Sequence, residues 1–319
     1  MKCTVLLPVY GAGAPLHVAI SSILAQDERD FEFLIIDDCS PDRSAVISRE
    51  YAARDNRIRT IFHVDNQGLA ATLNEGVRSA RTELVVRMDQ DDEALPSRIR
   101  TQLRYMETHP AIAVAGSFVY HMGRNRQYDR LVTLPTEPDE VARALPLGNC
   151  VYHPSVIFRR SCILGLGGYR SEFKNAEDYD LWLRASRSYS IANIPDPLLR
   201  YRFSPGGMTL GKKWQQMFYV QMALLSNRFP ELNYEDLRAA TAVEIDKLDK
   251  QYFLEQVAIG TVEELVRLHL WRDAVRVFAM FSRQIDRTRR WGLAKRTGTF
   301  VCRELGKPPG RAASATTRK

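Results

Sequence analysis

The sequence predicts an α/β protein with a mostly parallel central sheet and helices on both faces. Over roughly the first 120 residues, short apolar runs alternate with segments of helical periodicity. The hydrophobic and charged fractions of 45% and 26% are ordinary for a globular protein and exclude a disordered or fibrous chain. Polar clusters directly follow the apolar runs, as they do where parallel strands end beside a ligand site.

The predicted elements follow one another in regular alternation. Strands are expected where apolar or β-branched residues run together, at residues 4–9, 31–36, 58–62, 84–88 and 112–120. Helices are expected where apolar residues recur every three or four positions, at residues 15–25, 44–53, 68–80 and 96–109. Pro96 suits the first turn of the last helix, where its missing N–H costs no hydrogen bond.

The rest of the chain is less regular at first and then helical. A strand is expected at residues 155–159, a helix at 177–186 and a strand at 191–194, and after Lys212 the pattern is helical to about Trp291. We therefore expect an α/β domain at residues 1–210, a helical extension at 211–306 and a disordered basic tail at 307–319.

The positive charge of the chain is concentrated at its C-terminal end. The net charge is +7, but residues 267–319 hold 14 Lys/Arg and 3 Asp/Glu, a balance of +11 that leaves −4 for the first 266 residues. Such asymmetry predicts a polyanionic surface as partner, or else a solvated helix face and tail.

The cysteines and the hydropathy pattern indicate a cytoplasmic protein. The five cysteines are scattered and never spaced as CxxC, which is typical of free thiols in a reducing compartment and of neither a disulfide framework nor a zinc site. We find no apolar run long enough to span a membrane and expect no secretory signal.

The acidic tetrapeptide Asp89-Gln90-Asp91-Asp92 predicts a divalent metal site. It follows an apolar strand, and three carboxylates in four positions repel one another unless a cation neutralises them. Mg²⁺ or Mn²⁺ prefers such oxygen ligands and would share them with a substrate phosphate. The alternative is an acidic loop that caps the helix beginning near Pro96.

Further polar residues end the neighbouring strands. The first strand ends at Pro8, Val9 and Tyr10, and Asp37-Asp38 follow the second strand. Asp38 could accept a hydrogen bond from a base N–H or a ribose hydroxyl, or it could cap the next helix. The stretch 65–68 opens a helix with a glycine, which could attract a phosphate or serve as an ordinary helix start.

Adjacent carboxylates at Glu177 and Asp178 are candidates for acid–base chemistry. Two neighbouring carboxylates raise the pKa of one of them, which a general base near neutral pH requires. The alternative is that the helix dipole simply favours acids at a helix start. His153 is, by itself, more typical of a structural histidine. The motifs GxxxxGK[ST], HExxH and GxSxG are absent.

Taken in order, these motifs resemble the family 2 glycosyltransferases, which have the Rossmann-like GT-A fold. The resemblance covers roughly residues 3–210. The motifs that carry it are Pro8-Val9-Tyr10, Asp37-Asp38-Cys39-Ser40, Asn66-Gln67-Gly68-Leu69, Asp89-Gln90-Asp91-Asp92, His153-Pro154-Ser155 and Glu177-Asp178.

The resemblance implies inverting, metal-dependent transfer of one sugar from a nucleoside-diphosphate sugar, most often a UDP-sugar. The acceptor would be a hydroxyl of a glycan or lipid-linked molecule in cell-surface polysaccharide synthesis. Transfer of a single sugar is expected because the QxxRW signature of processive synthases is absent.

The resemblance also assigns roles to individual residues. Asp178 would be the general base, with Glu177 beside it. The metal would be bound by Asp91, Asp89 and Asp92. The other residues implied to bind substrate are Pro8, Val9, Tyr10, Asp37, Asp38, Asn66, Gly68, Asp89, His153 and Arg202. Tyr201-Arg202-Phe203-Ser204 matches a segment that often reads Tyr-Arg-x-His, so Ser204 puts in doubt any contact made by that histidine.

A basic amphipathic helix is predicted at residues 262–291. Its apolar positions are Leu265, Leu268, Trp271, Val275, Phe278, Phe281 and Ile285. This helix could lie on an anionic membrane surface or pack its apolar stripe on the rest of the protein. Because acceptors of such enzymes are often lipid-linked, we favour peripheral contact with the inner face of the membrane.

Other classes of function are less consistent with the sequence. A sugar nucleotidyltransferase usually has a basic residue in a glycine-rich loop after the first strand, but residues 11–15 contain neither Lys nor Arg. A non-catalytic nucleotide-sugar-binding module would not need both Asp91 and Asp178. RNA-binding aromatic signatures are absent, so no nucleic-acid partner is expected.

Overall fold

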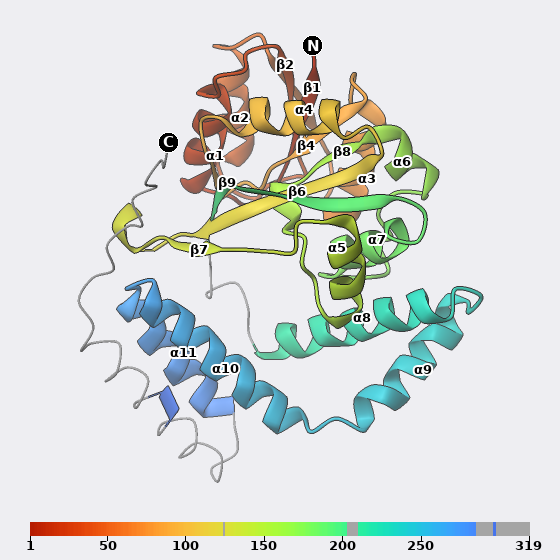
Figure 1. Ribbon diagram of the computed structural model, residues 1–319. Coiled ribbons are helices and arrows are strands. Elements are labelled where there is room, and N and C mark those ends of the chain that lie inside the picture. The colour runs from red at the N-terminus through yellow and green to blue at the C-terminus, as the bar shows by residue number, and fades with distance from the viewer. Residues whose placement is uncertain (124, 203–209, 285–295, 298–319) are drawn as a thin grey trace, which may run out of the picture. The chain divides into compact units, whose positions relative to one another are not determined.

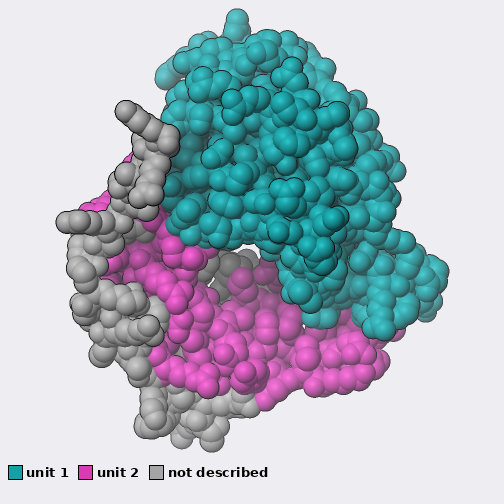
Figure 2. All heavy atoms as spheres, viewed as in Figure 1, with its two compact units in different colours: residues 1–120, 131–202, 219–238 teal, residues 121–130, 203–218, 239–319 magenta. Residues whose placement is uncertain are grey.

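The computed structural model describes residues 1–123, 125–202, 210–284 and 296–297, which form two compact units (Figures 1 and 2). The first unit comprises residues 1–120, 131–202 and 219–238, and the second comprises the other described residues. The expected tail at 307–319 and Ser204 lie outside the described residues.

A sheet of nine strands is present in the part of the chain that the structure describes. Its order is β3-β2-β1-β4-β8-β6-β9-β5, and β7 pairs with β6. The first four strands along this order are parallel to one another: β1 Cys3–Val9, β2 Phe31–Asp37, β3 Ile58–Phe62 and β4 Leu84–Arg87. Their carboxyl ends therefore lie at one edge of the sheet.

The other part of the sheet consists of the remaining strands, and each of their described pairings is antiparallel. They are β5 Glu93–Ala94, β6 Ile112–His121, β7 Arg130–Val132, β8 Ile157–Arg159 and β9 Ser190–Tyr201. Strand β8 runs antiparallel to both β4 and β6, and β5 runs antiparallel to β9. The sequence did not predict this change of direction, and it placed only residues 191–194 of the longer β9 in a strand.

The helices between the strands include the five predicted from helical spacing and two that the sequence analysis did not predict, at residues 138–144 and 160–165. They are α1 Pro15–Leu24, α2 Ser44–Ala52, α3 Leu69–Ser79, α4 Arg98–Thr108, α5 Pro138–Ala144, α6 Arg160–Gly165 and α7 Glu177–Ala185 (Figure 1). Every residue of β1 and β2 is buried, as expected of parallel strands covered on both faces. Short 3₁₀ turns occupy Arg126–Tyr128, Leu145–Leu147 and His153–Ser155.

A buried arginine ties the parallel strands to the antiparallel ones. The guanidinium of Arg98, at the start of α4, donates to the carbonyl oxygens of Arg87 (2.6 Å) and Pro154 (2.7 Å). One turn later, Gln102 Nε2 donates to the carbonyl oxygen of Ser155 at 2.7 Å. Burial lowers the pKa of Arg98 to about 9. These bonds hold the end of β4 against the turn that precedes β8.

The C-terminal helices are α8 Leu210–Arg228, α9 Tyr234–Asp246, α10 Lys250–Arg267 and α11 Trp271–Gln284. Helices α10 and α11 share a hydrophobic core that includes Leu265 and Val277. None of the described helices is long and apolar enough to cross a membrane.

The expectation of one helix over residues 262–291 is wrong. The helical stretch is interrupted between α10 and α11, where His269 adopts a left-handed conformation with φ of 57°. Leu265 and Leu268 are fully buried, whereas Val275 is 68% exposed, so the predicted apolar stripe does not form one continuous face. The side chain of Phe281 and all of Ile285 lie outside the described residues.

The packing of α3 on β1 gives a test of the fold. A Cβ at Gly76 of α3 would lie 2.3 Å from Cδ1 of the buried Leu6, so Gly76→Ala should lower the free energy of unfolding by about 1–3 kcal/mol. Gly260 in α10 has no such neighbour within 4 Å, and Gly260→Ala should raise the free energy by about 0.5–1 kcal/mol. Urea unfolding of both variants checks this. Equal midpoints would contradict the close approach of α3 to β1.

Candidate functional site

A pocket of about 390 Å³ lies at the carboxyl ends of β1, β2 and β4. It is lined by Pro8, Val9, Tyr10, Asp38, Asn66, Gly68, Leu69, Thr72, Asp89, Gln90 and Asp91. The structure thus brings together predicted residues that are up to 83 positions apart in the sequence. The parallel direction of the strands accounts for this convergence, because each strand ends at the same edge.

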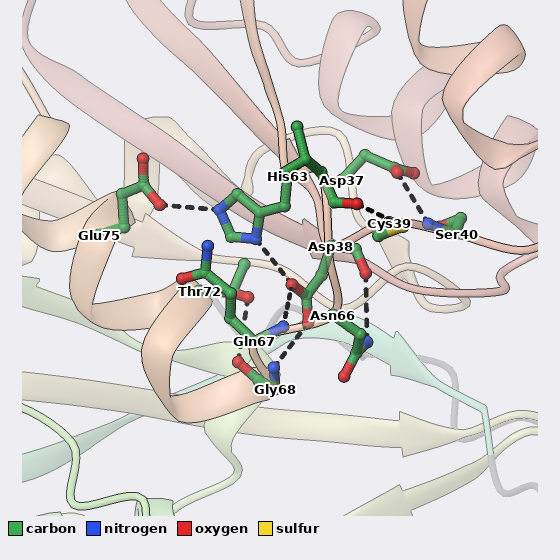
Figure 3. Close-up of polar contacts among 11 residues, drawn as sticks. Asp37, Asp38, Cys39, Ser40, His63, Asn66, Gln67, Gly68, Thr72 and Glu75 are labelled. Carbon is green, nitrogen blue, oxygen red and sulfur yellow. Dashed lines mark hydrogen bonds and ion pairs between the residues drawn. The ribbon is translucent and has the colours of Figure 1, made fainter.

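Asp38 organises one wall of the pocket (Figure 3). Its Oδ1 accepts the backbone N–H of Gln67 at 2.8 Å and contacts His63 Nδ1 at 2.6 Å. Its Oδ2 accepts the backbone N–H of Gly68 at 2.8 Å. Asn66 Nδ2 donates to the Asp38 carbonyl oxygen at 3.1 Å. One carboxylate therefore holds the loop that leads into α3.

The ionised form of Asp38 is favoured by these contacts. Burial alone would raise the pKa of Asp38, but the bonds from Gln67, His63 and Gly68 outweigh burial and lower it below the usual range. Gly68 has φ of 86°, a conformation that costs a glycine little. The result is a fixed, negatively charged acceptor at the pocket wall.

Gln90 joins the loop after β1 to the acidic tetrapeptide. Its Oε1 accepts the backbone N–H of Tyr10 at 2.7 Å, and its Nε2 donates to the Tyr10 carbonyl oxygen at 3.1 Å. The Tyr10 side chain is 50% exposed. Gln90 therefore fixes the backbone from which Tyr10 projects, a role that the sequence analysis missed.

The three carboxylates of the tetrapeptide have different surroundings. Asp89 forms an ion pair with the buried Arg87 at 2.6 Å. Asp91 lines the pocket, and burial together with the charge of Asp89 raises its pKa. Asp92 is fully buried and does not line the pocket; its Oδ1 accepts the backbone N–H of Arg202 at 2.7 Å. Of the three carboxylates of the tetrapeptide, those of Asp89 and Asp91 thus line the pocket.

A divalent cation fits Asp89 and Asp91 by charge. Among the described residues no group of three or more His, Cys, Asp or Glu is arranged to hold a metal. Mg²⁺ does not need one, because it commonly binds one or two carboxylates and completes its shell with phosphate oxygens and water. Burial and then the charge of Asp89 raise the pKa of Asp91, and a bound cation would favour its ionised form.

Arg202, the residue after β9, supports the tetrapeptide. Besides its backbone bond to Asp92, its Nε donates to the Asp91 carbonyl oxygen at 2.9 Å. Arg202 does not line the pocket. The structure places it behind the acidic residues, with its guanidinium holding their main chain.

Asp37 and His153 also lie away from the pocket lining, as do Glu177 and Asp178. Asp37 is buried, and its Oδ1 accepts the backbone N–H of Ser40 at 3.0 Å. His153 is buried, and its Nε2 lies 2.9 Å from the hydroxyl of Tyr169. Burial and the nearby charge of Arg87 lower the pKa of His153 well below the usual range.

Glu177 and Asp178 form a coupled acidic pair at the start of α7. Burial and the charge of Asp178 raise the pKa of Glu177 to about 7. Burial also raises the pKa of Asp178, whose Oδ2 accepts a hydrogen bond from Asn149 Nδ2 at 3.1 Å. Asp180, by contrast, is held in ion pairs with Arg170 and Arg184. Asp180 is thus neutralised by two arginines, whereas burial raises the pKa values of Glu177 and Asp178.

Arg87 is a site residue that the sequence analysis missed. Its guanidinium is buried and pairs with Asp89. Its positive charge partly opposes the increase in the pKa values of Glu177 and Asp178 that burial causes. Within the described part of the chain, its Nε and Nη1 have no hydrogen-bond partner. A charged residue at the end of an otherwise apolar strand, two positions before the tetrapeptide, was the available signal.

Solved structures share this fold. The S. aureus protein TarS, residues 1–349, aligns with a TM-score of 0.57 and 19% identity, covering 95% of this chain and 89% of TarS 1–349. The mannosyltransferase PcManGT from Pyrobaculum calidifontis, in complex with GDP-Man and Mn²⁺, aligns with a TM-score of 0.57 and 15% identity, covering 95% of this chain and 84% of its own. The fold is that of the GT-A glycosyltransferases.

Sequence comparison identifies the family. The model of glycosyl transferase family 2 matches residues 4–164, so the chain belongs to this family. WbnJ of Escherichia coli, an O-antigen biosynthesis glycosyltransferase, is 31% identical over 205 residues, covering 62% of this chain and 78% of WbnJ. AmsE of Erwinia amylovora, an amylovoran biosynthesis glycosyltransferase, is 31% identical over 171 residues, covering 51% of this chain and 64% of AmsE.

Proposed function

We propose that the protein transfers a single sugar, with inversion, from a nucleoside-diphosphate sugar to a hydroxyl of a glycan or lipid-linked acceptor. The observation that carries this proposal is one pocket with a fixed acceptor, Asp38, and a carboxylate suited to a cation, Asp91. The biosynthetic roles named for WbnJ and AmsE support an acceptor in cell-surface polysaccharide synthesis.

The state of Asp38 supports a uracil or guanine nucleotide as donor. An ionised carboxylate only accepts hydrogen bonds, with about four lone-pair positions, and three donors already contact Asp38. The remaining position suits the ring N–H of uracil or guanine. TarS has been solved with UDP and with UDP-GlcNAc, and PcManGT with GDP-Man. We take a UDP-sugar as the first choice.

A divalent cation, Mg²⁺ or Mn²⁺, would be held by Asp89 and Asp91 together with the donor diphosphate. When bound, it supplies positive charge that stabilises the departing diphosphate. Asp92 is left out of this proposed ligand set because it is buried behind the pocket and engaged by Arg202.

In the proposed reaction, the carboxylate of Asp178 takes the proton from the acceptor hydroxyl. The hydroxyl oxygen forms a bond to the anomeric carbon of the sugar as the bond from that carbon to the diphosphate oxygen breaks. The nucleoside diphosphate leaves with the electron pair, and attack from the opposite face inverts the configuration. Asn149 orients Asp178 through its hydrogen bond.

Metal dependence is tested by nucleotide binding. A chelator should weaken the affinity for UDP about 10-fold or more, because metal charge stabilisation is worth several kcal/mol. Asp91→Ala should weaken UDP binding and abolish most of the difference between chelator and excess Mn²⁺. Calorimetry measures both effects, and Glu231→Gln, which removes a charge from the exposed turn between α8 and α9, is the control. Equal UDP affinity of the wild type with and without metal would contradict the assignment.

The proposed base is tested by Asp178→Asn. The amide keeps the shape and the hydrogen-bonding capacity but removes the basic charge, so kcat should fall about 10²–10⁴-fold while UDP affinity changes little. Glu172→Gln removes a charge from the exposed turn before α7 and should leave kcat unchanged. Near-normal turnover of Asp178→Asn would move the role to Glu177, and loss of UDP binding would contradict the separation of base and donor site.

We further propose that the protein works at the inner face of the membrane. The outward face of α11 carries exposed Arg272 and Arg276, which suit anionic lipid headgroups. Charge reversal of both residues to Glu should weaken binding to anionic vesicles about 10-fold or more, since each basic residue contributes about 1 kcal/mol. Vesicle sedimentation measures this, with Arg54→Glu/Arg104→Glu as the control pair. Unchanged partitioning would exclude α11 as the contact.

A further inference from the structure

His63 lies directly behind the pocket, at the end of β3. Its ring is 4% exposed and is held on both nitrogens, with Nδ1 2.6 Å from Asp38 Oδ1 and Nε2 2.7 Å from Glu75 Oε2 (Figure 3). Its backbone N–H donates to the carbonyl oxygen of Asp37 at 2.9 Å. Glu75 lies on α3, so the ring joins β2, β3 and α3. His63 itself does not line the pocket.

The two carboxylate partners determine the protonation state of His63. An ionised carboxylate can only accept a hydrogen bond, so both ring nitrogens must donate, which only the imidazolium form can do. A neutral ring would keep one N–H and lose one of the two contacts. The cation is therefore the form that matches the observed geometry.

We propose that His63, supported by Glu75, is a positioning residue that fixes the carboxylate of Asp38 for nucleotide recognition. The inference rests on the proposed nucleotide-sugar function. Asp38 also accepts hydrogen bonds from the backbone N–H groups of Gln67 and Gly68. Rotation of its carboxylate would therefore disturb both this loop and the proposed contact with the nucleotide base. The proton on His63 thus acts through Asp38 on a pocket that the ring itself does not line.

The charged groups around the ring set the direction of its pH dependence. Those that face it are Asp38, at the end of β2, and Glu75, on α3. The Arg49 guanidinium of α2 stacks on Phe62, the preceding residue of β3. Burial alone would lower the pKa of His63, but the bonds and charges of the two carboxylates outweigh it and raise the pKa above the usual value. The positioning is present below that pKa and lost as pH rises through it.

The experiment is a calorimetric titration of the full-length protein with UDP and excess Mg²⁺ at several pH values around neutrality. The wild-type affinity should fall as pH rises through the pKa of His63. His63→Asn should bind UDP about 10-fold more weakly, as expected for loss of a hydrogen bond to a charged group, and should lose this pH dependence. Glu75→Gln keeps the shape but removes a charge, so its loss of affinity should occur at a lower pH than in the wild type.

Two features keep the test decisive. Titration of UDP itself is common to all variants, so a difference in midpoint between wild type and Glu75→Gln isolates the protein. His17→Asn removes an exposed histidine that contacts Tyr51 and should behave as wild type. If His63→Asn does not fold, the pH midpoint of UDP affinity in Glu75→Gln tests the inference by itself. An unchanged midpoint in Glu75→Gln, or wild-type affinity in His63→Asn, overturns the inference.

The same proteins separate this inference from the proposed function. If the wild-type protein binds no UDP at any pH, the result counts against the proposed donor. The protonation of His63 is then measured by NMR titration of its ring, with His17 as the internal reference. A His63 pKa that lies above that of His17 and falls in Glu75→Gln supports the inference. A pKa at or below that of His17 overturns it.

Discussion

The buried guanidinium of Arg98 is the interaction on which the rest of the site depends. Its bonds to the carbonyl oxygens of Arg87 and Pro154 hold two differently directed parts of the sheet together. A buried charge is costly unless its hydrogen bonds are made, so this arrangement has little freedom to change. From the end of β4 the chain continues into the acidic tetrapeptide, and from Pro154 it continues into β8. The bonds of Arg98 therefore help to fix the position of the acidic tetrapeptide at the edge of the pocket.

The loops of the site are fixed largely by hydrogen bonds between side chains and the backbone. Asp38 holds the N–H groups of Gln67 and Gly68, Gln90 holds Tyr10, and Arg202 holds the tetrapeptide. Each of these contacts joins the ends of two different elements. The loops at the edge of the sheet consequently share one hydrogen-bonded framework, which suits a site that must present charged groups in fixed positions.

Local patterns predicted the parallel strands and the convergence of their polar ends, because periodicity and strand direction determine both. They did not predict the antiparallel strands, since the pairing of β4 with β8 joins segments far apart in the chain. The break at His269 escaped notice because its left-handed conformation is not marked by a glycine. The sequence analysis assigned no role to Arg87 or Arg98, and only the fold reveals that both are buried.

The way Asp38 holds the loop has a consequence for how the sequence can diverge. Gln67 contributes its backbone N–H to Asp38, a group that almost every amino acid possesses. Gly68 contributes the same kind of group but from a left-handed conformation that disfavours a side chain. Mutation should thus be tolerated widely at position 67 and narrowly at position 68. Adjacent residues with equivalent hydrogen bonds would then accumulate substitutions at very different rates.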